Sequence, residues 1–157
     1  MRTIGTSTSE LATRLRHSIA RTARRLRQEA MAADGGAPGP TLTAALATIE
    51  AHGPLTPSEL AERERVRRPT ATRIVGRLEE EGLIERSADP ADGRSSLVRA
   101  SAEGRALLRR LRRRKDEYLA LRLAELDSRE LAALERAADV LERLADPDRE
   151  SDRRERA

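Results

Sequence analysis

Apolar residues recur at three- and four-residue steps along most of this chain, which is the spacing typical of amphipathic helices. The first such run lies between Leu11 and Ala30 and ends in the glycine- and proline-rich segment 34–40, which predicts a loop. A shorter run covers Thr41–Ala51 and stops at His52-Gly53-Pro54. Two helices separated by a loop are therefore expected at the start of the chain.

Two further helices with a short break between them are predicted next. Thr56-Pro57-Ser58-Glu59 has the residues of a capping box, with Thr at the N-cap, and it predicts a helix of about eight residues. Val66-Arg67-Arg68 is the break, and Pro69 suits the first turn of the helix that follows. This helix places Ile74, Val75 and Leu78 on one inward face and ends at Gly82.

A β-hairpin and two more helices complete the pattern. Leu83–Ser87 and Ser95–Ala100 read as two strands around a turn rich in Asp, Pro and Gly. Ser101 opens a fifth helix, and the segment 127–130 caps a sixth that continues to Pro147. We expect the charged, apolar-poor tail 147–157 to be disordered. The expected fold class is mainly α (α+β), in the element order of a winged helix-turn-helix.

Composition narrows the chemistry of the chain. Aromatic residues make up 1% of it, as Tyr118 alone, so the core must be aliphatic. With no cysteine, thiol redox switches, thiolate metal sites and disulfides are excluded. His17 and His52 are the only histidines and fall on different expected helices, so neither a metal site nor a cofactor is predicted. No segment approaches the roughly 20 apolar residues of a membrane span, and we expect a cytoplasmic protein.

Positive charge is concentrated in the middle of the chain. The 31 basic and 27 acidic residues give a net charge of +4. Between Arg63 and Arg77, six arginines stand against one acidic residue, Glu64. Such a window is either a solvated charged face or a surface that binds a polyanion, and its shortness favours the second interpretation.

The helix after the break is the expected recognition helix, about residues 68–81, and its first turns can enter a DNA major groove. Arginine can fork onto guanine, threonine hydroxyls can bond bases or phosphates, and Arg77 lies one turn further on, within reach of the backbone. The alternative for Thr70 and Thr72 is that they are ordinary threonines on a helix surface with no role in DNA binding. The predicted DNA-binding residues of this region are Arg67, Arg68, Pro69, Thr70, Thr72, Arg73 and Arg77.

These segments resemble the MarR (multiple antibiotic resistance regulator) family of winged-helix transcription factors. The matching stretches are residues 55–61, 69–75, 78–84 and 89–95, of which Asp89-Pro-Ala-Asp-Gly-Arg-Ser95 is the most specific. The resemblance implies that Arg94, in the wing of about residues 83–100, enters the minor groove braced by Asp92. A turn that uses Asp and Gly for geometry only is the alternative. Arg67 and Arg68 stand where many members have a small polar N-cap, so either the cap is lost or the arginines are kept for DNA.

The two terminal regions are predicted to form a dimer. The first and sixth helices carry apolar stripes, and a winged-helix module of about 60 residues has little surface to cover both. The resemblance also implies homodimers that bind pseudo-palindromic DNA, and a small-molecule effector at the junction of the dimer and DNA-binding regions. Residues 1–40 and 101–146 are the expected dimerisation parts, around a DNA-binding region 41–100. The predicted interface residues are Leu11, Leu15, Leu131, Leu134, Leu141 and Leu144.

Two functions remain open at this point. One is a sequence-specific, double-stranded-DNA-binding regulator of transcription, acting as a homodimeric repressor that a small-molecule ligand releases. The other is an architectural DNA-binding protein that uses the same arginines mainly on phosphate. An enzyme is not expected, because the sequence has no catalytic constellation or phosphate-binding glycine loop.

Overall fold

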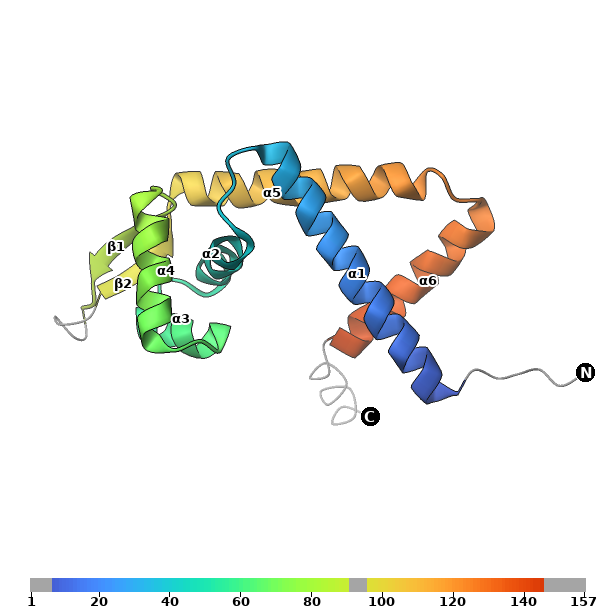
Figure 1. Ribbon diagram of the computed structural model, residues 1–157, viewed down its shortest axis with the longest axis horizontal. Coiled ribbons are helices and arrows are strands. Elements are labelled where there is room, and N and C mark those ends of the chain that lie inside the picture. The colour runs from blue at the N-terminus through green and yellow to red at the C-terminus, as the bar shows by residue number, and fades with distance from the viewer. Residues whose placement is uncertain (1–6, 91–95, 146–157) are drawn as a thin grey trace, which may run out of the picture. The chain divides into compact units, whose positions relative to one another are not determined.

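The computed structural model describes residues 7–90 and 96–145. These residues fall into two compact units, one up to Asp116 and the other from Glu117 onward. Figure 1 shows a mainly helical chain with one two-stranded hairpin. The elements are α1 (Thr8–Asp34), α2 (Pro40–His52), α3 (Pro57–Glu64), α4 (Arg68–Glu80), β1 (Ile84–Ala88), β2 (Ser96–Ala100), α5 (Ala102–Leu123) and α6 (Ser128–Ala145).

Local signals place most of these boundaries where the sequence predicts them. Thr56 accepts a hydrogen bond from the Glu59 amide at 3.2 Å, and the Glu59 carboxylate accepts one from the Thr56 amide at 2.7 Å. The same reciprocal bonds join Ser7 and Glu10 at the start of α1, a cap that was not predicted. Gly35 and Gly82 follow α1 and α4 with φ of 64° and 69°, a left-handed geometry that glycine adopts without strain.

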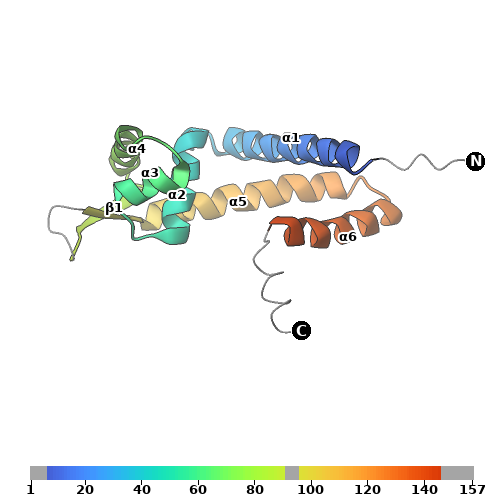
Figure 2. The same ribbon diagram turned by 90° about the horizontal axis from the view of Figure 1, so that it is seen from below.

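The core of the first unit is aliphatic, as composition predicts. Its fully buried side chains come from α2, α3, α4, β2 and α5, so all of these elements share one apolar centre: Leu46, Ile49, Leu60, Val75, Leu78, Val98 and Leu111. Leu55 adds a bridge to the hairpin, since its amide donates to the Val98 carbonyl at 3.1 Å. In both Figure 1 and Figure 2 the hairpin lies at the same end of this unit as α3 and α4.

Ion pairs attach the first unit's α5 residues to α1 and α2. Arg110 forks onto Asp34, the last residue of α1, with Nε–Oδ1 and Nη2–Oδ2 distances of 2.5 and 3.1 Å. The Asp34 side chain is only 3% exposed, and this guanidinium lowers the pKa of the carboxyl. Arg112 forms an ion pair with Glu50 of α2 through its Nη2 alone. A buried carboxylate is therefore satisfied by a residue 76 positions away.

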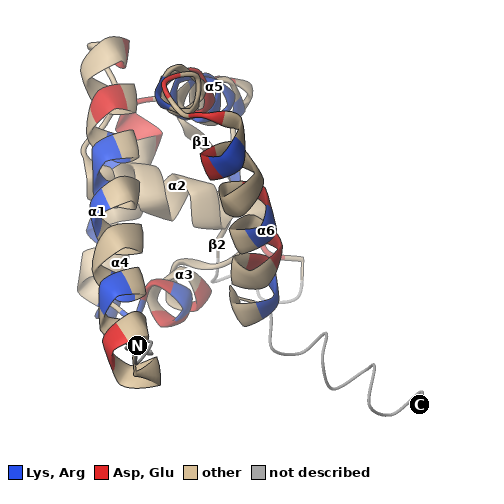
Figure 3. Ribbon diagram, turned by 90° about the vertical axis from the view of Figure 1, so that its right-hand side faces the viewer, with Lys and Arg blue, Asp and Glu red and all other residues tan. Residues whose placement is uncertain are grey.

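The second unit contains the end of α5 and all of α6. Asp127 and Glu130 exchange hydrogen bonds of 2.8 and 3.1 Å, so the predicted cap of the sixth helix is confirmed. Arg122 stacks over the Tyr118 ring at 5.4 Å. Figure 3 shows acidic and basic segments along α6, and no residue of this helix is buried.

Some predictions concern residues outside those described. The tail 147–157 is one, and the wing residues Asp92 and Arg94 are another. None of the described helices is long and apolar enough to cross a membrane. Within the same residues, no group of three or more His, Asp or Glu side chains has an arrangement that could hold a metal ion.

Candidate DNA-binding surface

A tight turn joins α3 to α4. Arg65 caps α3 in the left-handed conformation, with φ of 53°, and its amide bonds the Glu62 carbonyl at 3.2 Å. The Val66 amide returns to the Ala61 carbonyl at 2.9 Å. For a residue with a Cβ this conformation costs roughly 1–2 kcal/mol, yet it sets the direction in which α4 starts. The turn is thus fixed by backbone bonds and not by a glycine.

Helix α4 has one buried and one exposed face. Ala71, Ile74, Val75 and Leu78 are 0–6% exposed and pack into the core, as the 3.6-residue repeat predicts. The opposite face carries most of the residues predicted to bind DNA. Exposed there are Arg67, Arg68, Pro69, Thr72, Arg73 and Arg77, whereas Thr70 is half-buried.

The start of α4 lacks a side-chain cap. Arg67 occupies the N-cap position and accepts no amide hydrogen bond with its side chain, as expected for an arginine. Its carbonyl accepts instead from the amides of Thr70 and Ala71, at 2.9 and 3.1 Å. Thr72 donates its hydroxyl to the Arg68 carbonyl at 3.1 Å, so its oxygen has only lone pairs left to offer a ligand.

The arginines on this surface differ in how far they are already engaged. Among the described residues, no ion pair or side-chain hydrogen bond holds Arg67, Arg68 or Arg73. Arg77 lies 3.6 Å from Glu81 and 4.0 Å from Glu80, both in its own helix or at its end. A phosphate must therefore compete with carboxylates at Arg77, while the first turns of α4 present uncompensated positive charge.

The hairpin next to α4 is short and antiparallel. β1 and β2 pair from Ile84 opposite Ala100 to Ala88 opposite Ser96, one residue later on the first strand than the sequence suggests. Ile84, Val98 and Ala100 are buried, which fixes one face of the hairpin against the core. The turn between the strands includes residues 91–95, which are not described, so the predicted groove contacts of Asp92 and Arg94 lie outside the structure.

Sequence reasoning missed the residues that connect these elements. Arg86 in β1 donates to Glu79 of α4 at 2.7 Å, and the left-handed Arg65 sets the turn. Neither stands out in a one-dimensional pattern, because Arg86 occupies a strand position and Arg65 belongs to an arginine-rich window. The break at residues 66–68 was the only signal near the turn.

The predicted dimer residues lie on the exposed faces of their own helices. In α1, Leu11 and Leu15 are 46% and 37% exposed, and Ala30 is the only described buried residue of that helix. In α6, Leu131, Leu134 and Leu144 are exposed and Leu141 is half-buried. Each helix thus carries apolar side chains that its own unit leaves in solvent.

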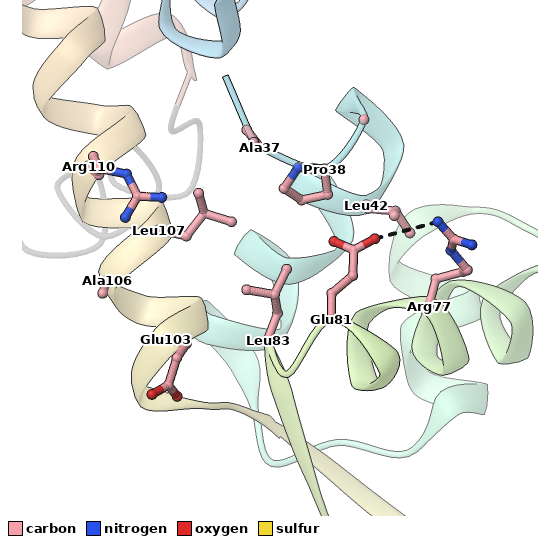
Figure 4. A pocket seen from close by; sticks show the side chains of 12 residues that line it. Ala37, Pro38, Leu42, Arg77, Glu81, Leu83, Glu103, Ala106, Leu107 and Arg110 are labelled. Carbon is pink, nitrogen blue, oxygen red and sulfur yellow. Dashed lines mark ion pairs between the residues drawn. The ribbon is translucent and has the colours of Figure 1, made fainter. Parts of the chain in front are cut away.

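A hollow of about 730 Å³ lies between the α1–α2 loop, the end of α4 and the start of α5. Figure 4 shows Leu42, Leu83 and Leu107 as apolar walls, with the Arg77–Glu81 ion pair at one side. Arg110 lines the other side. A group bound here would touch the end of α4 and the start of α5 at once.

The α3–turn–α4 unit, with its exposed basic helix and adjoining hairpin, defines a winged helix-turn-helix DNA-binding protein. The family model described as "MarR family" matches residues 40–96. An HTH-type transcriptional regulator of Mycobacterium tuberculosis is 43% identical over 102 residues, which are 65% of this chain and 71% of that protein. The chain belongs to the MarR family of HTH-type transcriptional regulators, and it is a non-enzymatic DNA-binding regulator of transcription.

Solved structures have a similar fold. A putative transcriptional regulator from Pseudomonas aeruginosa superposes with a TM-score of 0.77 at 36% identity, covering 90% of this chain and 97% of that chain. A mutant of MepR from S. aureus, solved bound to an oligodeoxyribonucleotide, has a TM-score of 0.65 at 20% identity and covers 86% and 96%. The family and the mainly helical fold with a two-stranded wing, both expected from the sequence, are confirmed.

Proposed function

We propose that this protein is a homodimeric repressor of transcription that recognises a specific sequence in double-stranded DNA. The observation that carries the proposal is the exposed face of α4, where Arg67, Arg68 and Arg73 have no described partner. Arginines without ion-pair partners, on a helix whose other face is buried, can reach phosphates and base edges without first breaking ion pairs. The protein acts in the cytoplasm, where such a regulator meets its DNA.

The residues divide between base and phosphate contacts. Arg73, in the second turn of α4, is suited to a forked bond with guanine, and the methyl of Thr72 to contact with a thymine methyl. Arg67, Arg68 and the Pro69–Thr70 turn lie at the positive end of the helix, where phosphates are favoured. Arg77 serves the backbone as well, at the expense of its pairs with glutamates.

The wing supplies a second contact. Arg94 enters the minor groove and Asp92 braces it, as the family resemblance implies. Arg94→Ala should reduce the magnitude of the salt slope of binding by about one. Asp92→Ala separates two explanations: bracing predicts weaker binding, whereas loss of a negative charge alone predicts tighter binding. Tighter binding would reduce Asp92 to a turn residue.

Two copies of the chain form the functional molecule. Residues 1–40 and 101–146 make the dimer around the DNA-binding region 41–100, and the exposed leucines of α1 and α6 form its interface. Removing residues 1–34 should give a monomeric or poorly soluble remnant. Sedimentation of the full chain as a well-folded monomer would contradict the dimer. Two recognition helices then meet successive major grooves, so the operator is a pseudo-palindrome with half-sites about one helical turn apart.

Repression follows from occupancy, and a ligand in the α4–α5 hollow releases it. Such a ligand would contact Arg77 and Glu81 on the recognition helix and Leu107 on α5, and so would favour one arrangement of these helices over another. Ala106→Leu, which fills part of the hollow, should leave DNA binding intact and abolish release by any small molecule that displaces the wild type. Equal release from both proteins would place the ligand elsewhere.

Selection of bound fragments from a random DNA pool tests the proposal. A specific regulator enriches one pseudo-palindromic sequence over successive rounds. The architectural alternative, which uses phosphate contacts alone, enriches only bendable or A·T-rich DNA without a defined motif. Finding no motif would therefore contradict the proposed function and favour that alternative.

A further inference from the structure

Arg86 lies on the face of the hairpin that also carries its buried residues, although the residue itself is exposed. In the strand register it lies opposite Val98, which is fully buried, and two residues after the buried Ile84. Because side chains alternate between faces along a strand, Arg86 shares the inward face with these apolar residues. Its side chain is 34% exposed. A partly covered cation beside apolar side chains gains from charge-assisted hydrogen bonds to partners close by.

Two partners satisfy it, and they come from different elements. The Arg86 Nε donates to Oε2 of Glu79 in α4 at 2.7 Å, and Nη1 donates to Oγ of Ser96 in β2 at 3.1 Å. One planar guanidinium thus joins the recognition helix to both strands of the wing. Its flat fork fixes direction as well as distance, which a lysine ammonium would not do.

The proposed function gives the Arg86 link between α4 and the hairpin a role in DNA binding. A two-stranded hairpin is marginally stable alone, and a wing that pivots must be ordered when it meets DNA. We propose that Arg86 is a positioning residue, which with Glu79 holds the wing at a set angle to α4 so that both fit adjacent grooves. This rests on the proposed DNA contacts of α4 and the wing. Arg86 acts through Glu79 and does not itself touch DNA.

The same hairpin provides a matched control. Arg99 forks onto Glu85 of the opposite strand, with Nε and Nη2 at 2.9 and 2.7 Å from one carboxylate oxygen. These two residues face each other across the strands, on the face away from Arg86. The pair is as close as the Arg86–Glu79 pair, but it stays within the hairpin. Arg99→Met removes the same charge as Arg86→Met without loosening α4 from the wing.

A second control lies in the recognition helix. Glu79→Gln and Glu80→Gln each remove one carboxylate from adjacent positions, and within the described residues the one ion pair of Glu80 is with Arg77, at 4.0 Å. If Arg86 contacted phosphate directly, Glu79→Gln would free its charge and tighten binding, as Glu80→Gln should. A positioning role predicts the opposite sign for Glu79→Gln.

The experiment measures affinity for a selected DNA site across a salt series, with hydrogen exchange of the hairpin amides in the DNA-free protein. We expect Glu79→Gln and Arg86→Met each to weaken binding about five- to tenfold with an unchanged salt slope. The double variant should be no weaker than Arg86→Met alone, because both changes break one connection. Exchange of the β1 and β2 amides should accelerate more in these variants than in Arg99→Met.

Three results would overturn the inference: tighter binding by Glu79→Gln, a salt slope reduced by about one in Arg86→Met, or equal effects of Arg86→Met and Arg99→Met. The exchange measurement needs no DNA. If the wild type shows no sequence preference, the proposed function fails while the exchange comparison still decides whether Arg86 orders the wing.

Discussion

Two glycines in helices of the first unit should respond in opposite ways to the same substitution. Gly104 lies in the first turn of α5, where a Cβ would stand 2.1 Å from the Leu83 carbonyl oxygen and 3.1 Å from Cδ1 of Leu46. Gly76 lies in α4, where a Cβ would meet nothing within 4 Å. Alanine is favoured over glycine in a helix interior by about 1 kcal/mol, so propensity alone predicts that both variants are stabilised.

The surroundings of Gly104 reverse that sign. The nearest oxygen is more than 1 Å closer than the 3.4 Å at which ordinary contact begins. It cannot move away freely, because Leu83 accepts a hydrogen bond from the Ser101 amide at 3.0 Å. Ser101 is itself tied to the Gly82 carbonyl at 2.6 Å and to the Gly104 amide at 3.0 Å. Overpacking of this kind costs typically 1–3 kcal/mol or more, which exceeds the gain in propensity.

Urea denaturation of both variants at one protein concentration measures the effect, since the proposed dimer would make stability depend on concentration. We expect Gly76→Ala to raise the free energy of unfolding by about 0.5–1 kcal/mol and Gly104→Ala to lower it by about 1–3 kcal/mol. A Gly104→Ala protein as stable as the wild type would refute the reasoning, because it would show that the start of α5 does not contact Leu83, the residue before β1.

Three further predictions concern Arg73, Arg65 and Asp34. Arg73→Ala should cost about 1–3 kcal/mol on the preferred DNA and relax the preference at one base pair, and an equal loss on random DNA would reassign it to phosphate. Arg65→Gly should raise the unfolding free energy by up to about 1 kcal/mol, because the left-handed turn no longer strains a Cβ; a lower value by chemical denaturation would contradict this. Arg110 lowers the pKa of Asp34, so the folded protein binds fewer protons there than the unfolded chain. The resulting contribution to folding stability is complete above the ordinary carboxyl pKa and is lost as the pH falls through the lowered pKa of Asp34. Asp34→Asn should therefore make the free energy of unfolding fall less steeply as the pH is lowered. An unchanged slope in acid would show that Asp34 does not contribute to this loss.

The helices were predictable from the sequence because their signals are local. The Thr56 capping box, the Gly82 C′ position and the inward face of α4 all depend on residues within one or two turns, and the structure confirms each. The strand pair was predictable for the same reason, to within one residue at its first strand.

Contacts between distant parts of the chain were not predictable. Asp34 and Arg110 are 76 positions apart, and nothing in either neighbourhood distinguishes Arg110 from the other arginines of α5. The Arg86–Glu79 pair depends on the angle between a strand and a helix, which no periodicity encodes. The candidate DNA-binding residues were identified by type and position, while their state of engagement, free for Arg73 but paired for Arg77, required the three-dimensional structure.

The central claim is that the exposed face of α4 reads sequence and does not merely hold phosphate. The most direct test is the ratio of two dissociation constants of the wild type, for its selected site and for a scrambled duplex of equal length, at about 0.15 M salt. We predict a ratio of at least about a thousand, the lower end for specific DNA-binding proteins. A ratio near one, with the same salt slope on both duplexes, would contradict the account.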